Sequence, residues 1–107
     1  MIKLLNELNK LEGKDFEDLS AKDFQDVIDN ILSKYGRVWR EVVVEDRGDG
    51  KRGRIDLVLL TDKDSLLLAF EIDRKTERKK SVFKLEQYPS QRSYVLLRSP
   101  FRMIRIK

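Results

Sequence analysis

The chain has 107 residues, of which 40% are hydrophobic and 39% charged, and this predicts a single domain over 1–107 with a highly charged surface. Cysteine and histidine are absent, which excludes disulfide bonds, thiolate zinc sites and mechanisms that need a Cys nucleophile or a His base. Any chemistry must therefore use carboxylates, hydroxyls, Lys and Arg, with a cation that prefers oxygen ligands.

The formal net charge of +4 is unevenly distributed along the chain. Residues 1–35 contain five basic and eight acidic side chains, whereas residues 74–107 contain eleven basic and two acidic ones. A basic C-terminal third favours a polyanionic partner such as nucleic acid, although a solvated ionic surface gives the same counts. No apolar run is long enough to span a bilayer, and the start lacks the features of a secretion signal. We therefore expect no membrane partner and a cytoplasmic location.

Two helices are predicted in the first third of the chain. Apolar residues at helical spacing predict a helix over 2–11, within an N-terminal helical extension of about residues 1–19. A second helix is predicted over 21–35, with Ser20 as its N-cap and Gly36 at its C-terminal end. The second helix is expected to begin the core of the domain.

Three strands are predicted next. Residues 37–46 are rich in β-branched side chains and form the first strand, which a glycine-rich loop over 47–53 follows. Residues 54–60 and 66–73 are nearly continuous apolar runs joined by a short polar segment. This pattern predicts a hairpin whose two strands are buried on both faces.

The C-terminal third alternates again between helix and strand. Thr76 is the expected N-cap of a basic amphipathic helix over 77–88. A buried strand over 93–98 follows, and then an edge strand over 101–107 in which apolar and basic residues alternate. The predicted fold class is α/β, with a central mixed β-sheet flanked by helices.

Acidic residues interrupt the two apolar strands of the hairpin. Asp56 lies in the first strand, and Glu71 and Asp73 lie in the second. If Thr61 and Leu66 flank a four-residue loop, antiparallel pairing places Asp56 directly opposite Glu71. Facing carboxylates repel each other, so a positive charge must offset them.

Two sources of that positive charge are consistent with the sequence. One is an ionic network at the strand ends with the neighbouring bases Arg54, Arg74 and Lys75. The other is Mg²⁺ or Mn²⁺ held by Asp56, Glu71 and the main-chain carbonyl of Ile72, which are hard oxygen ligands.

Basic side chains surround the predicted acid pair. Positive charge at a helix start is unfavourable by itself, so the cluster at the start of the 77–88 helix favours an anionic partner. We predict that a phosphate-bearing partner such as nucleic acid contacts the following residues: Lys51, Arg52, Arg54, Arg74, Arg78, Lys79, Lys80 and Lys84.

The order of elements and three short motifs together resemble a known family. The motifs are RID at 54–56, FEIDRK at 70–75 and YVLLR at 94–98. They resemble the αβββαβ core of the PD-(D/E)XK nucleases, which include restriction endonucleases and archaeal Holliday junction resolvases. The resemblance covers roughly residues 20–98, and it implies a restriction endonuclease-like core with an extra N-terminal helix.

The resemblance also implies site residues. Asp56 and Glu71 match the two motif acids that bind Mg²⁺, although Ile55 stands where the motif has proline. The motif lysine is expected at position 73, where this chain has Asp73. The nearest lysine on the same strand face is Lys75.

Other residues can fill the remaining positions of the motif. Lys84 is an alternative to Lys75, because it can reach the site from the helix. If neither lysine takes the position, Asp73 is a third metal ligand or the site is degenerate. Asp73 is also a candidate proton acceptor. Gln25 and Asp26 are nearest to the acid or amide that the family often carries on its first helix.

The implied function is a metal-dependent endonuclease that hydrolyses DNA phosphodiester bonds, a Mg²⁺-dependent deoxyribonuclease. Its catalytic residues would be Asp56, Glu71, Asp73 and Lys75, with Lys75 steadying the attacking hydroxide or the developing negative charge. Cutting two strands favours a homodimer. One alternative is a degenerate nuclease-fold protein that binds nucleic acid without cleaving it. Another is a protein-interaction subunit whose acids are structural.

Overall fold

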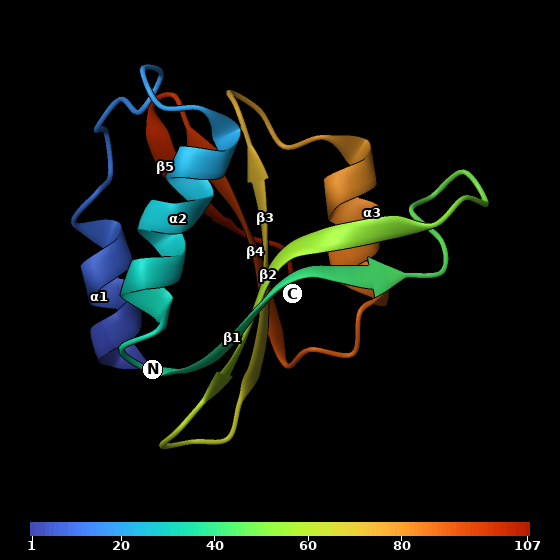
Figure 1. The fold of residues 1–107 in the computed structure, drawn as a ribbon, viewed down its shortest axis with the longest axis horizontal. Coiled ribbons are helices and arrows are strands. Elements are labelled where there is room, and N and C mark those ends of the chain that lie inside the picture. The colour runs from blue at the N-terminus through green and yellow to red at the C-terminus, as the bar shows by residue number, and fades with distance from the viewer.

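A computed structural model describes residues 1–107 as a five-stranded mixed sheet with three helices (Figure 1). The elements in chain order are α1 (Ile2–Asn9), α2 (Ala21–Leu32), β1 (Gly36–Val44), β2 (Gly53–Thr61), β3 (Leu67–Asp73), α3 (Lys79–Gln87), β4 (Arg92–Arg98) and β5 (Phe101–Arg105). The predicted α/β class and the mixed sheet flanked by helices are confirmed. No helix has both the length and the apolar character needed to cross a membrane.

The strands lie side by side in the same order as in the chain. Neighbouring strands are antiparallel except β3 and β4, which are parallel and are joined through α3. Helices α1 and α2 cover one face of the sheet, and α3 covers the other (Figure 1). The central strands are therefore buried on both faces, as their continuous apolar sequences predict.

Each face of the sheet has its own hydrophobic core. The larger core lies under α1 and α2, where Phe24 and Ile28 pack against Leu57 and Phe70. The smaller core lies under α3 and is built around Leu85. Helix α1 contributes buried leucines to the larger core, so the N-terminal segment is part of the packed structure.

Helix α2 begins at its predicted N-cap, but both N-terminal helices are shorter than expected, and Gly36 is the first residue of β1 instead of the C-terminal cap of α2. The Ser20 hydroxyl accepts a hydrogen bond from the Asp23 N–H at 3.0 Å, which confirms Ser20 as the N-cap of α2. The regular helix ends at Leu32, and a turn carries the chain to Tyr35. The periodicity of the sequence does not distinguish the last helical residues from this turn.

The predicted start of α3 was wrong. The helix begins at Lys79 with Arg78 as its N-cap residue, and no side-chain hydrogen bond comes from the cap residue itself. The Asp73 carboxylate at the end of β3 instead accepts the Arg78 N–H at 2.9 Å. An acid from the preceding strand thus takes the capping role that we had expected of Thr76.

Candidate active site

Strands β2 and β3 separate at the two acids. The register that we predicted is observed between 57–60 and 67–70, but the backbone pairing stops one position before Asp56 and Glu71. The two acids therefore lie on the same side of a fork between neighbouring strands, at the end where the ladder opens.

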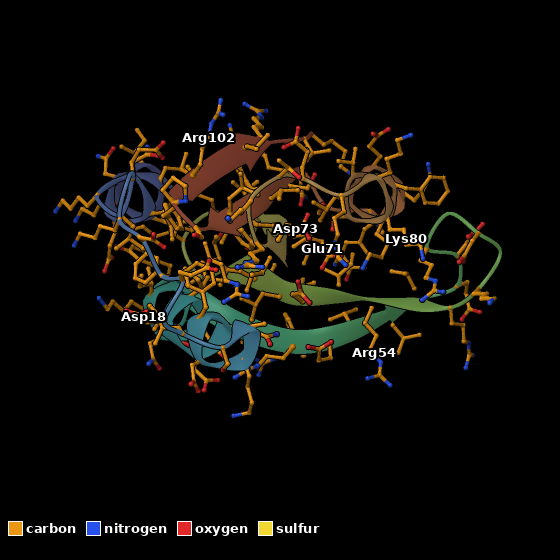
Figure 2. The ribbon with its side chains drawn as sticks, turned by 90° about the horizontal axis from the view of Figure 1, so that it is seen from above. Asp18, Arg54, Glu71, Asp73, Lys80 and Arg102 are labelled. Atoms are coloured by element: carbon orange, nitrogen blue, oxygen red, sulfur yellow. The ribbon has the colours of Figure 1, made fainter.

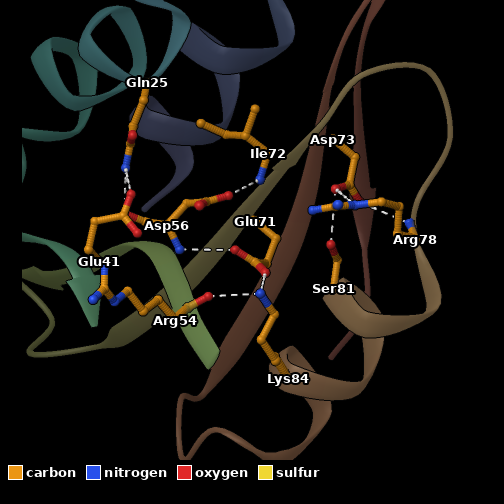
Figure 3. A network of polar contacts seen from close by, with 10 residues as sticks. All are labelled: Gln25, Glu41, Arg54, Asp56, Glu71, Ile72, Asp73, Arg78, Ser81 and Lys84. Atoms are coloured by element: carbon orange, nitrogen blue, oxygen red, sulfur yellow. Dashed lines mark hydrogen bonds and ion pairs between the residues drawn. The ribbon is translucent and has the colours of Figure 1, made fainter. Parts of the chain in front are cut away.

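Side chains take over the hydrogen bonds that the backbone ladder lacks at this fork (Figure 3). The Asp56 N–H donates to Glu71 Oε2 at 2.9 Å, and the Ile72 N–H donates to Asp56 Oδ2 at 2.7 Å. The Asp56 carbonyl accepts from Gln25 Nε2 at 2.8 Å. Each acid thus binds the backbone of the other strand, which fixes the two carboxylates side by side.

The β1–β2 hairpin turns sharply at the level of Asp56. Leu57 faces the larger core, whereas Ile55, which shares its alternation, faces the core under α3. Between these levels Glu41 has a φ of 54°, a left-handed conformation that is uncommon for residues other than glycine. Its Oε1 accepts a hydrogen bond from Gln25 Nε2 at 3.3 Å. This turn carries the far half of the hairpin over α3 (Figure 1).

Lys84 supplies the positive charge that the acid pair needs. It reaches from α3, donates to the Arg54 carbonyl at 2.8 Å and forms an ion pair with Glu71 Oε1. Its side chain is only 12% exposed. Lys75, in contrast, is exposed and forms no ion pair. It lies beyond the end of β3, so the strand alternation that we used to place it near the acids does not extend to it.

One lysine does not fully compensate two acids in this setting. The pKa of Glu71 is raised to about 8, mainly by burial and then by the nearby Asp56 carboxylate, while Lys84 acts in the opposite direction. Glu71 is 1% exposed. The site therefore favours additional positive charge beside the two carboxylates.

Asp73 belongs to a separate arrangement. Its Oδ1 accepts from Arg78 Nε at 2.9 Å and from the Ser81 hydroxyl at 3.0 Å, in addition to the Arg78 N–H on Oδ2. These contacts tie it to the start of α3 (Figure 3). No group of three or more acidic side chains is arranged to hold a metal ion, so the structure does not bring Asp73 to Asp56 and Glu71 as a third ligand.

A hollow of about 670 Å³ opens beside the fork. It lies between the start of α2, the β1–β2 hairpin and the end of β3. Its polar lining combines oxygen-bearing side chains and bases: Gln25, Glu41, Asp56, Lys22, Arg40 and Arg78. Glu71 does not line this hollow.

Seven of the eight bases predicted to contact nucleic acid are exposed. Four of the seven form ion pairs with acids: Arg52, Arg74, Arg78 and Lys80. Three form none: Lys51, Arg54 and Lys79. Figure 2 shows Arg54 and Lys80 on the side of the molecule where the loop between β1 and β2 lies, with Glu71 and Asp73 near the centre. Lys84 is the exception, because it points inward to Glu71.

Two polar residues of the hollow differ in how well the sequence indicated them. Gln25 and Asp26 on α2 were the two candidates for the acid or amide of the motif. Gln25 contacts the site, whereas Asp26 forms surface ion pairs with Arg40 and Lys22. Glu41 was not predicted. Its only signal in the sequence is an acid within a segment rich in β-branched residues, and its position depends on the left-handed conformation that Glu41 adopts where the hairpin turns.

Comparisons with known proteins add no relative: no protein-family model matches the chain, and no curated protein matches its sequence. The resemblance to nucleases therefore rests on the residues and the order of elements of this chain.

Proposed function

We propose that this protein is a metal-dependent endonuclease that hydrolyses DNA phosphodiester bonds at the fork between β2 and β3. The observation that carries the proposal is the convergence of Asp56, Glu71 and Lys84 where the two strands separate. The acid pair and its lysine, of which Asp56 lines a hollow that also carries Lys22, Arg40 and Arg78, suit the binding of a phosphodiester and a divalent cation.

The order of elements supports the same proposal. From α2 to β4 the chain runs helix, three antiparallel strands, helix and a strand parallel to the third. This is the order that the resemblance to the PD-(D/E)XK core implies. Helix α1 and strand β5 are additions at its two ends.

The donor set at the fork fits Mg²⁺ or Mn²⁺. The Asp56 and Glu71 carboxylates and the main-chain carbonyl of Ile72 would hold the ion, whose charge would oppose the burial and the Asp56 charge that raise the pKa of Glu71. A bound divalent cation polarises a phosphate and lowers the pKa of water.

The chain's own residues have distinct tasks in this proposal. Lys84 offsets charge on the acid pair, so Lys84 instead of Lys75 is the lysine of the proposed site. Gln25 holds the Asp56 backbone in place, because its side-chain Nε2 donates a hydrogen bond to the Asp56 carbonyl. A second copy of the chain, which cleavage of both strands would use, is part of the proposal.

A second candidate function is nucleic-acid binding without cleavage. It is favoured by Asp73 at the position of the motif lysine, and by Glu71, whose two oxygens already have protein partners. In this alternative the two acids stabilise the fork, and the exposed bases alone bind the nucleic acid.

Incubation with branched, single-stranded and duplex DNA in Mg²⁺ or Mn²⁺ tests the proposal. Wild type should cleave at least one substrate, and Glu71→Gln and Asp56→Asn should each reduce the rate by roughly 100-fold or more. Glu77→Gln is the control, because it removes an exposed acid that forms no ion pair.

Three other outcomes would contradict the proposal. Equal cleavage by all variants indicates a contaminating nuclease. Salt-sensitive binding without cleavage, unaffected by the acid substitutions, supports the second candidate. Neither binding nor cleavage, with lost stability in the acid variants, indicates that the acids are only structural.

A further inference from the structure

Asp73 and Arg78 form an unusual pair at the edge of the hollow. The Asp73 side chain is fully buried, whereas the Arg78 side chain is 68% exposed. The contact uses only the Nε of the guanidinium, at 2.9 Å from Asp73 Oδ1. The two Nη groups of Arg78 form no hydrogen bond within the protein, so they remain available to a ligand.

The guanidinium is not the only group that ties Asp73 to α3. Asp73 also receives the Arg78 N–H and the Ser81 hydroxyl, which hold the helix start. The Nε contact adds a fixed position for the Arg78 side chain. Figure 3 shows that the side chain runs back over Asp73 toward the fork, and Arg78 lines the same hollow as Asp56.

The other two bases of the hollow are held differently. Arg40 uses its terminal Nη1 for Asp26 at 2.6 Å, and the same nitrogen lies 3.5 Å from Asp29. Lys22 pairs with Asp26 at 3.6 Å. Acids of α2 thus engage the charged ends of both bases. Arg78 alone presents an unoccupied guanidinium fork.

We propose that Arg78, positioned by Asp73, binds a phosphate of the nucleic-acid backbone in the hollow. A guanidinium fork matches two phosphate oxygens. The proposal rests on the proposed function, and it names the group that receives the substrate. It also gives Asp73 a role: the acid at the position of the motif lysine holds an arginine, which returns positive charge to the site.

The test measures binding to a short fluorescein-labelled DNA duplex in EDTA by anisotropy over a range of salt concentrations. Arg78→Gln should weaken binding roughly tenfold and reduce the slope of log K against log salt by about 1. Arg78→Lys keeps the charge but loses the fork, so it should preserve most of the slope and still weaken binding.

Arg102→Gln is the matched control. Arg102 is an exposed arginine on β5, and Figure 2 shows it away from Glu71 and Asp73. If Arg78→Gln and Arg102→Gln weaken binding equally, Arg78 contributes only net charge and the inference is wrong, while cleavage by the wild type would still support the proposed function. If the wild type neither binds nor cleaves DNA, the proposed function fails, and this inference fails with it.

The positioning role of Asp73 has its own readout. Asp73→Asn should weaken binding in the wild-type background and have little further effect together with Arg78→Gln, because it acts through Arg78. Ser81→Ala removes a capping bond but leaves the Arg78 contact, so it should lower the melting temperature without changing binding. Additive losses from Asp73→Asn and Arg78→Gln would show that Asp73 does not act through Arg78.

Discussion

Glu71 and Asp73 lie two residues apart on β3 and are almost equally buried, yet their surroundings differ. Asp73 accepts hydrogen bonds from a main-chain N–H, a guanidinium and a hydroxyl. Glu71 faces a second carboxylate and has one lysine as its charged partner. A buried acid with a full set of donors stabilises structure, whereas an acid left short of positive charge indicates a binding site.

Among single substitutions at neutral pH, the largest stability effect is expected at Asp73. Asp73→Ala removes the capping bond to the Arg78 N–H and leaves the buried Ser81 hydroxyl without its partner. We expect the free energy of unfolding to fall by about 3 kcal/mol, measured by urea denaturation. Asp26→Ala, which removes exposed ion pairs, should cost less than about 1 kcal/mol. Equal losses would contradict the structural assignment of Asp73.

A smaller effect is expected at Lys84. Lys84→Met keeps the aliphatic stem but removes the charge beside Glu71 and the bond to the Arg54 carbonyl. The free energy of unfolding should fall by about 2 kcal/mol, less than for a buried pair of fixed charges, because Glu71 with a pKa of about 8 is mostly protonated at neutral pH and is not left as an unpaired charge. Lys75→Met, at an exposed lysine without an ion pair, should change it by less than about 0.5 kcal/mol. Similar losses in both variants would contradict the placement of Lys84 at the site.

The pH dependence of stability separates the two acids further. The folded-state pKa of Glu71 is raised from 4.5 to about 8, so the folded protein holds a proton that the unfolded chain releases between these values. Stability should therefore fall as pH rises from about 5 to 8, with a slope of at most about 1.4 kcal/mol per pH unit from this group. Glu71→Gln should remove that part of the slope in denaturation curves measured across this range. Parallel curves for the two proteins would show that Glu71 is not the group responsible.

Local chemistry in the sequence predicted several of these features correctly. The alternation of Asp56 with its apolar neighbours and the loop length set the β2–β3 register, and this brought Asp56 and Glu71 to one fork. Ser20 capped α2 because an N-cap depends on contacts within a few residues. Both inferences required only short-range geometry.

The features that the sequence did not reveal depend on packing between distant elements. We expected Lys75 to follow the face of β3, but the strand ends at Asp73. Lys84 reaches Glu71 because α3 packs against β2 and β3. The left-handed Glu41 arises where the hairpin turns from one core to the other. No local pattern encodes either arrangement.

The smallest predicted effect is stabilisation by metal, and it tests the idea that Glu71 lacks positive charge. A divalent cation that binds the folded protein only stabilises it by about 1.4 kcal/mol at roughly ten times its dissociation constant. Mg²⁺ or Mn²⁺ should therefore raise the melting temperature of wild type but not of Glu71→Gln or Asp56→Asn. Because binding requires ionised Glu71, it releases a proton, so the shift should grow as pH rises toward 8. Asp73→Asn should retain the shift, since Asp73 contacts α3 instead of the fork. A shift that persists in Glu71→Gln and disappears in Asp73→Asn would reverse the roles of the two acids.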